Sequence, residues 1–113
     1  YGTILTDGGD GSGGRASRNV CIFAGRQVDR SPTGSGVTAR MALLAARRQV
    51  SAGEDRRFES VTDAQFSGRI LREVRAGRHR AWTVEVGGEA HYTGEAVFRF
   101  EDEDPLRWGF ALE

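Results

Sequence analysis

A single long run of helix-forming residues sets the architecture open to this chain. Residues 37–50 read VTARMALLAARRQV, in which alanine, leucine, methionine and arginine all favour a helix. Val37, Met41 and Leu44 recur at helical spacing, yet alanine and leucine occupy most of the other positions as well. A helix that is apolar nearly all round is typical of a buried helix, so we expect the rest of the chain to enclose this run.

Short β-forming runs separated by glycine occupy most of the remaining sequence. A glycine-rich stretch, residues 7–14, is expected to be a mobile loop that links the first two strands, and the Gly77, Gly87–Gly88 and Gly94 separators suit hairpin turns. The predicted strands are residues 1–6, 18–24, 57–62, 66–74, 81–86, 89–94 and 96–100. The pattern predicts an α+β fold in which an antiparallel sheet wraps around a buried central helix.

Composition excludes several classes of function. The 16 acidic and 16 basic residues balance, so no charge pattern indicates nucleic acid or an anionic membrane as a partner. No apolar stretch is long enough to span a bilayer. The single cysteine, Cys21, excludes an internal disulfide framework and favours a reducing compartment, so we expect a cytoplasmic location. Because the chain opens at Tyr1 without a methionine, we expect an N-terminal part to be missing.

The residues able to bind a metal are scattered. Cys21 lies in an apolar run and is expected in the core, His79 in an exposed turn, and His91 in a strand. Asp102 and Asp104 suit a solvated turn, because the calcium-loop pattern is absent. We therefore expect no metal site.

The turn before the helical run, DRSPTGSG at residues 29–36, has the properties of an anion site. A helix N-terminus exposes backbone N–H groups, and glycine leaves them uncovered, as at Gly34. Thr33 and Ser35 add hydroxyl groups, and Asp29 can accept a hydrogen bond from a cationic or N–H-bearing group. A small amino or imino acid, with its carboxylate close to its nitrogen, fits this description.

A structural interpretation of the same turn stays open. Gly, Ser, Thr and Pro often precede helices simply as caps. The turn lacks the Gly-Lys-[Ser/Thr] ending of a phosphate-binding loop and the G-x-G-x-x-G pattern, so its sequence does not indicate a nucleotide site.

The stretch VDRSPTGSGVTARMALL closely resembles the second active-site motif of the proline racemase family, and more narrowly of its trans-3-hydroxy-L-proline dehydratase branch. YGTILTDG, FSGRI, GEAHYTG and DPLRWGF resemble other parts of the C-terminal half of the family, in the same order. The resemblance therefore covers essentially the whole chain. One departure is Asp63, which stands where the family often has glycine.

The resemblance implies a specific chemistry at Thr33. Racemases of the family carry a second catalytic cysteine at this position, since they need an acid/base group on each face of Cα. A threonine hydroxyl is far too weak an acid to replace a thiol with a pKa of about 8.5. Dehydration of trans-3-hydroxy-L-proline to Δ1-pyrroline-2-carboxylate needs one base, which the resemblance places in a cysteine beside a Gly-His pair outside this sequence. The alternatives are a non-catalytic fragment that binds a proline-like ligand and, disfavoured by Thr33, a proline racemase or hydroxyproline epimerase.

The resemblance also implies residue roles. Thr33 would be catalytic and face the substrate ring near the leaving hydroxyl. Gly34 and Ser35 would offer backbone N–H groups to the substrate carboxylate, and Asp29 would accept from the ring nitrogen. The family uses neither a metal nor an organic cofactor, and the expected partner is a small-molecule substrate, with a homodimer possible for the full-length protein.

The fold implied by the resemblance is a two-lobe architecture like that of diaminopimelate epimerase, with the active site between the helix N-termini. Residues 1–113 would form the C-terminal lobe. Residues 95–113, approximately, would return to pack on the N-terminal lobe.

Overall fold

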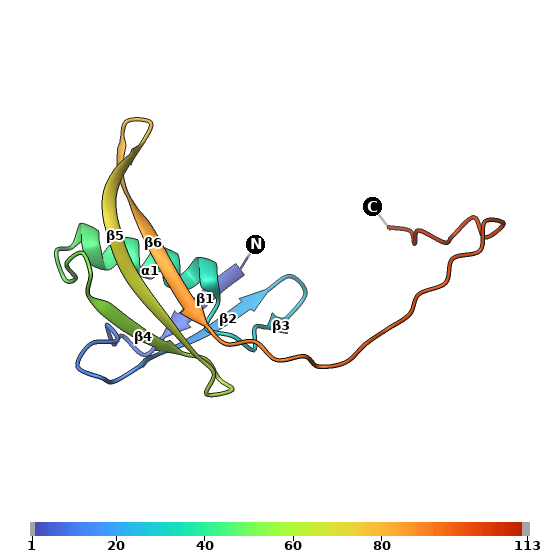
Figure 1. Ribbon diagram of the computed structural model, residues 1–113, viewed down its shortest axis with the longest axis horizontal. Helices are drawn as coiled ribbons and strands as arrows, with labels where there is room; N and C mark the ends of the chain where they lie inside the picture. The colour runs from blue at the N-terminus through green and yellow to red at the C-terminus, as the bar shows by residue number, and fades with distance from the viewer. Residues whose placement is uncertain (1, 112–113) are drawn as a thin grey trace.

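The computed structural model describes residues 2–111, and within them the chain forms six strands and one helix. Tyr1, part of the first predicted strand, and residues 112–113 lie outside the described residues. In chain order the elements are β1 (Gly2–Thr6), β2 (Ser17–Phe23), β3 (Gln27–Val28), α1 (Gly34–Ala46), β4 (Asp55–Glu59), β5 (Gln65–Ala76) and β6 (His79–Gly88). A long tail leaves the end of β6 (Figure 1).

The strands form one mixed sheet in the order β1-β2-β4-β5-β6, with β3 paired to β2. Every pair is antiparallel except β2 and β4, which run parallel through the Ser17–Phe58 and Arg18–Glu59 partners. At this pair the sheet departs from the predicted antiparallel arrangement. The cause is α1, which lies between the two strands in the chain and serves as the crossover that parallel neighbours require.

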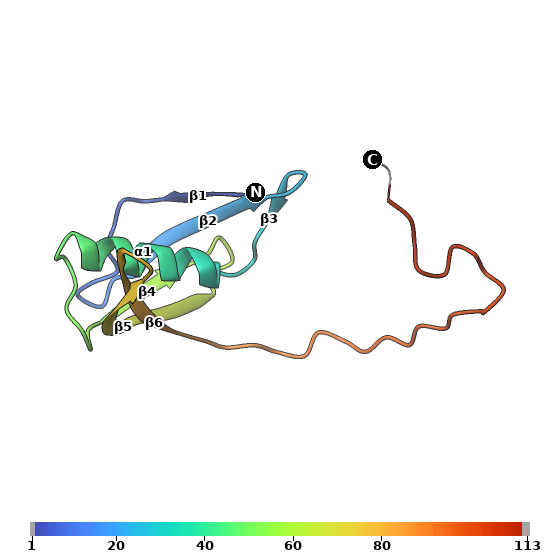
Figure 2. The ribbon, with the colours of Figure 1, turned by 90° about the horizontal axis from the view of Figure 1, so that it is seen from above.

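The sheet curls so that its two ends lie on opposite sides of α1 (Figure 2). Two glycines permit this close approach. A side chain at Gly68 of β5 would place its Cβ 2.8 Å from the Cγ of Met41, and one at Gly36 would meet Ile4 of β1. The α+β fold with a sheet around a central helix is therefore confirmed.

The core is small and lies along one face of α1. Val37, Met41 and Leu44 pack with three residues from the rest of the chain: Val50, Phe58 and Ile70. Met41 is completely buried, whereas Leu43 remains 47% exposed. The prediction of a helix buried all round is therefore wrong for residues 2–111, because the sheet covers one face and leaves the other face open.

Several boundaries differ from the sequence predictions. The helix starts and ends earlier than residues 37–50, and Gly87–Gly88 pair with β5 inside β6 rather than forming a turn. Gly77 does form the β5–β6 turn, with a φ of 59°. Asp63 has a φ of 62°, a conformation that favours glycine, so an aspartate stands here at a backbone geometry that suits glycine.

The glycine-rich loop between β1 and β2 is tied to the sheet instead of standing free. The Ser17 hydroxyl donates to the Asp7 carboxylate over 2.7 Å, and the Arg57 N–H donates to the Gly11 carbonyl over 3.0 Å. These bonds hold both the start and the middle of the loop.

The two predicted strands at residues 89–94 and 96–100 are not formed. Residues 89–111 contain no strand, and their large apolar side chains are exposed. The exposed apolar residues of this segment are Tyr92, Val97, Phe98, Phe100, Leu106, Trp108 and Phe110. A strand needs a pairing partner, and no described residue supplies one here. The predicted strand position of His91 is wrong for the same reason, while Asp102 lies in a turn and Asp104 lies between two turns.

We predict that truncating the buried face of α1 destabilises the fold and that truncating its open face does not. Met41→Ala should lower the free energy of unfolding by about 2–5 kcal/mol, because it removes a buried side chain and leaves a cavity. Leu43→Ala is the matched control on the same helix, and its effect should stay within about 1 kcal/mol. Urea denaturation measures both, and equal losses would contradict the one-sided burial.

Candidate active site

Thr33 lies at the N-terminus of α1 in a strained backbone conformation. It is the residue that precedes the helix, with φ 67° and ψ 102°, and its side chain makes no capping hydrogen bond. A positive φ is uncommon for a β-branched residue and costs about 1–3 kcal/mol. Thr33 therefore occupies the capping position, but its hydroxyl is directed elsewhere.

The hydroxyl of Thr33 donates to the carboxylate of Asp29. The distance from Thr33 Oγ1 to Asp29 Oδ2 is 2.8 Å. The other oxygen of Asp29, Oδ1, accepts from the Ser31 N–H over 2.8 Å and from the Ser31 hydroxyl over 2.9 Å. The structure thus joins two of the predicted site residues directly, and adds Ser31, to which the sequence assigned no role. The Asp-x-Ser spacing, typical of an Asx turn, was the available signal.

These donors keep Asp29 ionised. Burial on its own would raise the pKa of the Asp29 carboxyl. The hydrogen bonds from the Ser31 N–H, the Thr33 hydroxyl and the Ser31 hydroxyl outweigh that effect and hold the pKa below its ordinary value of 3.8. At neutral pH the site therefore carries a fixed negative charge, which suits a cationic or N–H-bearing group of a ligand.

The bond to Asp29 also defines what Thr33 can offer to a ligand. A hydroxyl has one hydrogen to donate and two lone pairs to accept with. Because the carboxylate takes the hydrogen of Thr33, the lone pairs of Oγ1 remain for a hydroxyl or N–H group of a bound molecule.

The first turn of α1 lies next to this pair and is open. The Val37 N–H donates to the Thr33 carbonyl over 2.8 Å, which begins the helix, while the N–H groups before it have no acceptor within α1. A side chain at Gly34 would meet nothing within 4 Å, and Ser35 is exposed. No acidic side chain occupies this first turn. It can therefore bind a carboxylate.

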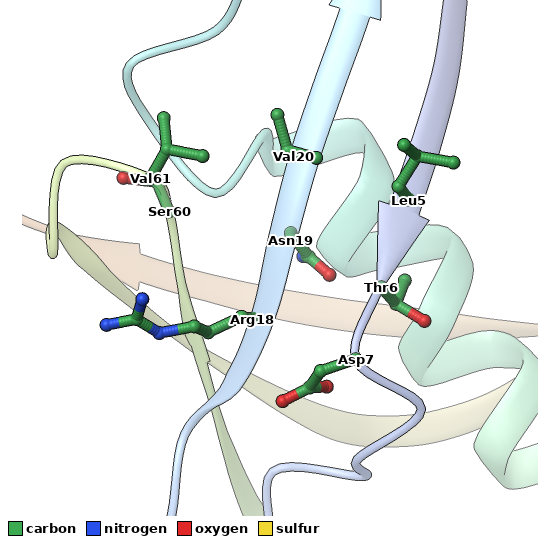
Figure 3. Close-up of a pocket in the computed structure, with 8 residues that line it drawn as sticks. All are labelled: Leu5, Thr6, Asp7, Arg18, Asn19, Val20, Ser60 and Val61. Carbon is green, nitrogen blue, oxygen red and sulfur yellow. The ribbon is translucent and has the colours of Figure 1, made fainter.

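A shallow groove of about 200 Å³ lies elsewhere, between β1, β2 and the turn after β4 (Figure 3). Leu5, Val20 and Val61 give it apolar walls, and α1 lies behind the strands in this view. None of the four predicted site residues lines it. We place the candidate site at the helix mouth because the fixed charge and the open N–H groups meet there.

Other candidate residues are not assembled into a site. Cys21 is buried in β2, and His79 and His91 are exposed. Among residues 2–111, no three side chains of His, Cys, Asp or Glu are grouped so as to hold a metal ion. No helix in the described part of the chain has the length and apolar character needed to cross a membrane.

Comparison with known proteins identifies the family. Residues 2–111 match the proline racemase family. The chain belongs to this family. Its membership confirms the resemblance that the DRSPTGSG turn indicated.

Two solved members of the proline racemase family share the fold. One is a hydroxyproline epimerase from Agrobacterium vitis with bound trans-4-hydroxy-L-proline, at 27% identity and a TM-score of 0.79. The other is a probable proline racemase from Agrobacterium radiobacter with bound carbonate, at 25% identity and a TM-score of 0.80. Each alignment covers 96% of this chain, and it covers 30% of the first structure and 31% of the second.

Curated members of the proline racemase family are similar over the whole chain. Trans-L-3-hydroxyproline dehydratase of Bos taurus and trans-3-hydroxy-L-proline dehydratase of Homo sapiens are each 52% identical over 100% of this chain. The dehydratase of Burkholderia cenocepacia is 43% identical over 99% of it. The chain spans about a third of the length of these relatives, 32% for the two mammalian proteins and 33% for the bacterial one.

We predict that Thr33→Val raises the pKa of Asp29, because it removes one of the hydrogen bonds that stabilise the carboxylate. A folded-state pKa that is lowered contributes stability above the ordinary pKa, and this contribution is lost as the pH falls through the lowered value. In Thr33→Val this contribution to stability should therefore be smaller, and its loss on acidification should be complete at a higher pH.

Carboxyl ¹³C NMR titration measures the Asp29 pKa directly. Thr38→Val is the matched control, since the Thr38 hydroxyl bonds to the Gly34 carbonyl and does not contact Asp29. An Asp29 pKa that is unchanged in Thr33→Val would contradict the assigned hydrogen bond.

Proposed function

We propose that the protein containing this chain is a trans-3-hydroxy-L-proline dehydratase. The observation that carries the proposal is a threonine at the helix mouth, Thr33, bound to an ionised Asp29 over 2.8 Å. Relatives with this name at 43–52% identity support it. The proposed reaction removes water from trans-3-hydroxy-L-proline and yields Δ1-pyrroline-2-carboxylate.

The chemistry requires a base on only one face of the ring. The base takes the proton from C2, the C–H electron pair forms the C2–C3 double bond, and the C3–O bond breaks. The leaving hydroxide takes up one proton, which balances the proton that the base removed from C2, and departs as water, and the resulting enamine tautomerises to the pyrroline. In this scheme the base is supplied by a part of the protein outside this chain. By analogy with the family, it is a cysteine beside a Gly-His pair.

The geometry supports distinct roles for the four site residues. Asp29 accepts a hydrogen bond from the protonated ring nitrogen, and the N–H groups of Gly34 and Ser35 bind the carboxylate. Thr33 lies near the 3-hydroxyl of the substrate. Its Oγ1 accepts a hydrogen bond from that hydroxyl, because the Thr33 hydroxyl already donates its own hydrogen to Asp29. In this arrangement Thr33 orients the leaving group, and no second acid/base group of thiol strength is present at position 33.

We also propose that residues 1–113 form the C-terminal lobe of a two-lobe protein, with approximately residues 95–113 returning to the N-terminal lobe. The exposed aromatic side chains of the tail support this, since Phe98, Trp108 and Phe110 are each more than three-quarters exposed. A cytoplasmic location and a homodimer of the full-length protein belong to the same proposal. The one cysteine of this chain is free and buried in β2, as suits a reducing compartment.

The proposed activity predicts different outcomes for two substrates. The full-length protein should convert trans-3-hydroxy-L-proline to the pyrroline, followed by its absorbance or by NMR. With L-proline in D₂O it should not give D-proline. Rapid racemisation of proline would exclude the dehydratase assignment in favour of a racemase.

Thr33→Cys tests whether position 33 separates the two chemistries. A thiol has a pKa of about 8.5 and can exchange a proton with Cα on the second face, so the variant should gain measurable epimerisation of hydroxyproline. Thr33→Ser is the matched control, because it keeps a hydroxyl and should gain none. Chiral chromatography of the product detects the gain, and its absence in Thr33→Cys would show that more than this side chain separates the activities.

A further inference from the structure

Polar side chains of β2 and of the turn after β4 hold the turn that carries Thr33. Asn19 of β2 donates from Nδ2 to the Pro32 carbonyl over 3.2 Å. The hydroxyls of Ser60 and Thr62 donate to the Arg30 carbonyl over 2.6 and 2.7 Å. Two peptide groups of the turn, Arg30–Ser31 and Pro32–Thr33, are therefore held by residues that lie outside the turn.

The bond from Asn19 acts directly on the conformation of Thr33. The Pro32 carbonyl belongs to the peptide group that joins Pro32 to Thr33, so the orientation of this group determines the φ of Thr33. The carbonyl of Thr33 is held on the other side by the Val37 N–H. With both peptide groups fixed, Thr33 is kept at its unfavourable φ of 67°, from which its hydroxyl reaches Asp29.

The carboxamide of Asn19 is itself oriented. It is 3% exposed, and its Oδ1 accepts from Arg40 Nη1 over 2.6 Å. A guanidinium can only donate hydrogen bonds, so Oδ1 must face Arg40, and the amide nitrogen is left to face Pro32. Arg40 therefore determines which way round the Asn19 side chain lies.

Arg40 is held in turn by three different parts of the fold. It belongs to α1, its guanidinium lies 4.8 Å from the ring centroid of Phe58, and its second amino group donates to the Gly9 carbonyl of the glycine-rich loop. The chain of contacts runs from loop, helix and core through Arg40 and Asn19 to the Pro32 carbonyl.

We propose that Asn19 is a positioning residue for dehydration: it holds the Pro32–Thr33 peptide so that the Thr33 hydroxyl stays on Asp29, and Arg40 sets its orientation. This inference rests on the proposed function. It assigns no contact between Asn19 and the substrate, because Asn19 is buried beneath the turn.

Asn19→Asp tests the inference in the full-length protein. The change is nearly isosteric and keeps an acceptor for Arg40, but it removes the donor and places an oxygen against the Pro32 carbonyl. We expect kcat/KM for trans-3-hydroxy-L-proline to fall about 10- to 100-fold, the loss that misplacing a group at the site produces.

A double-mutant cycle separates positioning from general stability. If Asn19 acts through Thr33, then Asn19→Asp should cause little further loss in a Thr33→Ala background. A merely structural residue would lower activity by the same factor in both backgrounds, and that result would overturn the proposal.

Ser17→Ala is the matched control. Ser17 lies two residues away on the same strand and the same buried face, is 1% exposed, and bonds to Asp7 instead of to the turn. We expect its activity to stay close to that of the unmodified protein. A loss equal to that of Asn19→Asp would overturn the proposal.

Amide hydrogen exchange of residues 29–37 gives a readout that does not depend on activity. It should be faster in Asn19→Asp and unchanged in Ser17→Ala. Equal protection in both variants would overturn the positioning role. Failure of the unmodified protein to dehydrate the substrate would instead refute the proposed function, so the two failures are distinguishable.

Arg40→Lys provides a second variant if Asn19→Asp does not fold. A lysine keeps the charge, but its ammonium is a single point donor and cannot reproduce the fork that reaches Asn19 and Gly9 together. Exchange of residues 29–37 should again accelerate, and the fall in kcat/KM should again be absent in the Thr33→Ala background. Full activity with unchanged exchange would overturn the assigned role of Arg40.

Discussion

The left-handed conformation of Thr33 is the constraint on which the rest of the site depends. In this conformation the Thr33 hydroxyl turns back to Asp29, while the backbone after it starts α1. A single residue thus joins the negative charge of a carboxylate to the positive end of a helix, a few atoms apart. Such a juxtaposition suits a ligand that carries both charges on neighbouring atoms, as an amino or imino acid does.

The strained conformation of Thr33 is held by hydrogen bonds to its turn instead of being relieved by glycine. Most chains would place glycine at a φ of 67°, but glycine has no hydroxyl to offer. Asn19, Ser60 and Thr62 make the conformation available to a residue with a functional side chain. Asp63 likewise carries a side chain at a positive φ, and this side chain forms an ion pair with Arg18 over 2.9 Å.

The fold could be predicted from sequence where local pattern and pairing agree. Val37, Met41 and Leu44, which recur at helical spacing, are the residues of α1 that the core buries, although the run as a whole predicted burial on all sides, and the β-forming run at residues 81–86 lies within β6. Residues 89–100 have an equally strong β pattern, yet form no strand, because pairing depends on a partner that the pattern does not specify. The parallel β2–β4 pair was missed for a related reason, since it follows from where α1 crosses and not from either strand alone.

The sequence indicated the candidate site residues of the turn, but it did not predict the residues that hold this turn in place. Gly, Ser and Thr before an apolar run indicate a helix start with open N–H groups, and an Asp four residues before Thr33 was close enough to be noticed. Asn19 lies 13 positions before Pro32 in the chain, and Arg40 follows within the helix itself. Contacts of that kind exist only after the sheet has closed, so no local spacing reveals them.

The division between the sheet and its tail has a consequence for synthesis of the protein. Every strand pair of the described chain lies within residues 2–88, and so does the helix that packs against the sheet. The strand partners seen in the described structure are therefore all synthesised before residues 89–111 leave the ribosome. The aromatic side chains of the tail are synthesised last, and they are accessible to chaperones until another surface covers them.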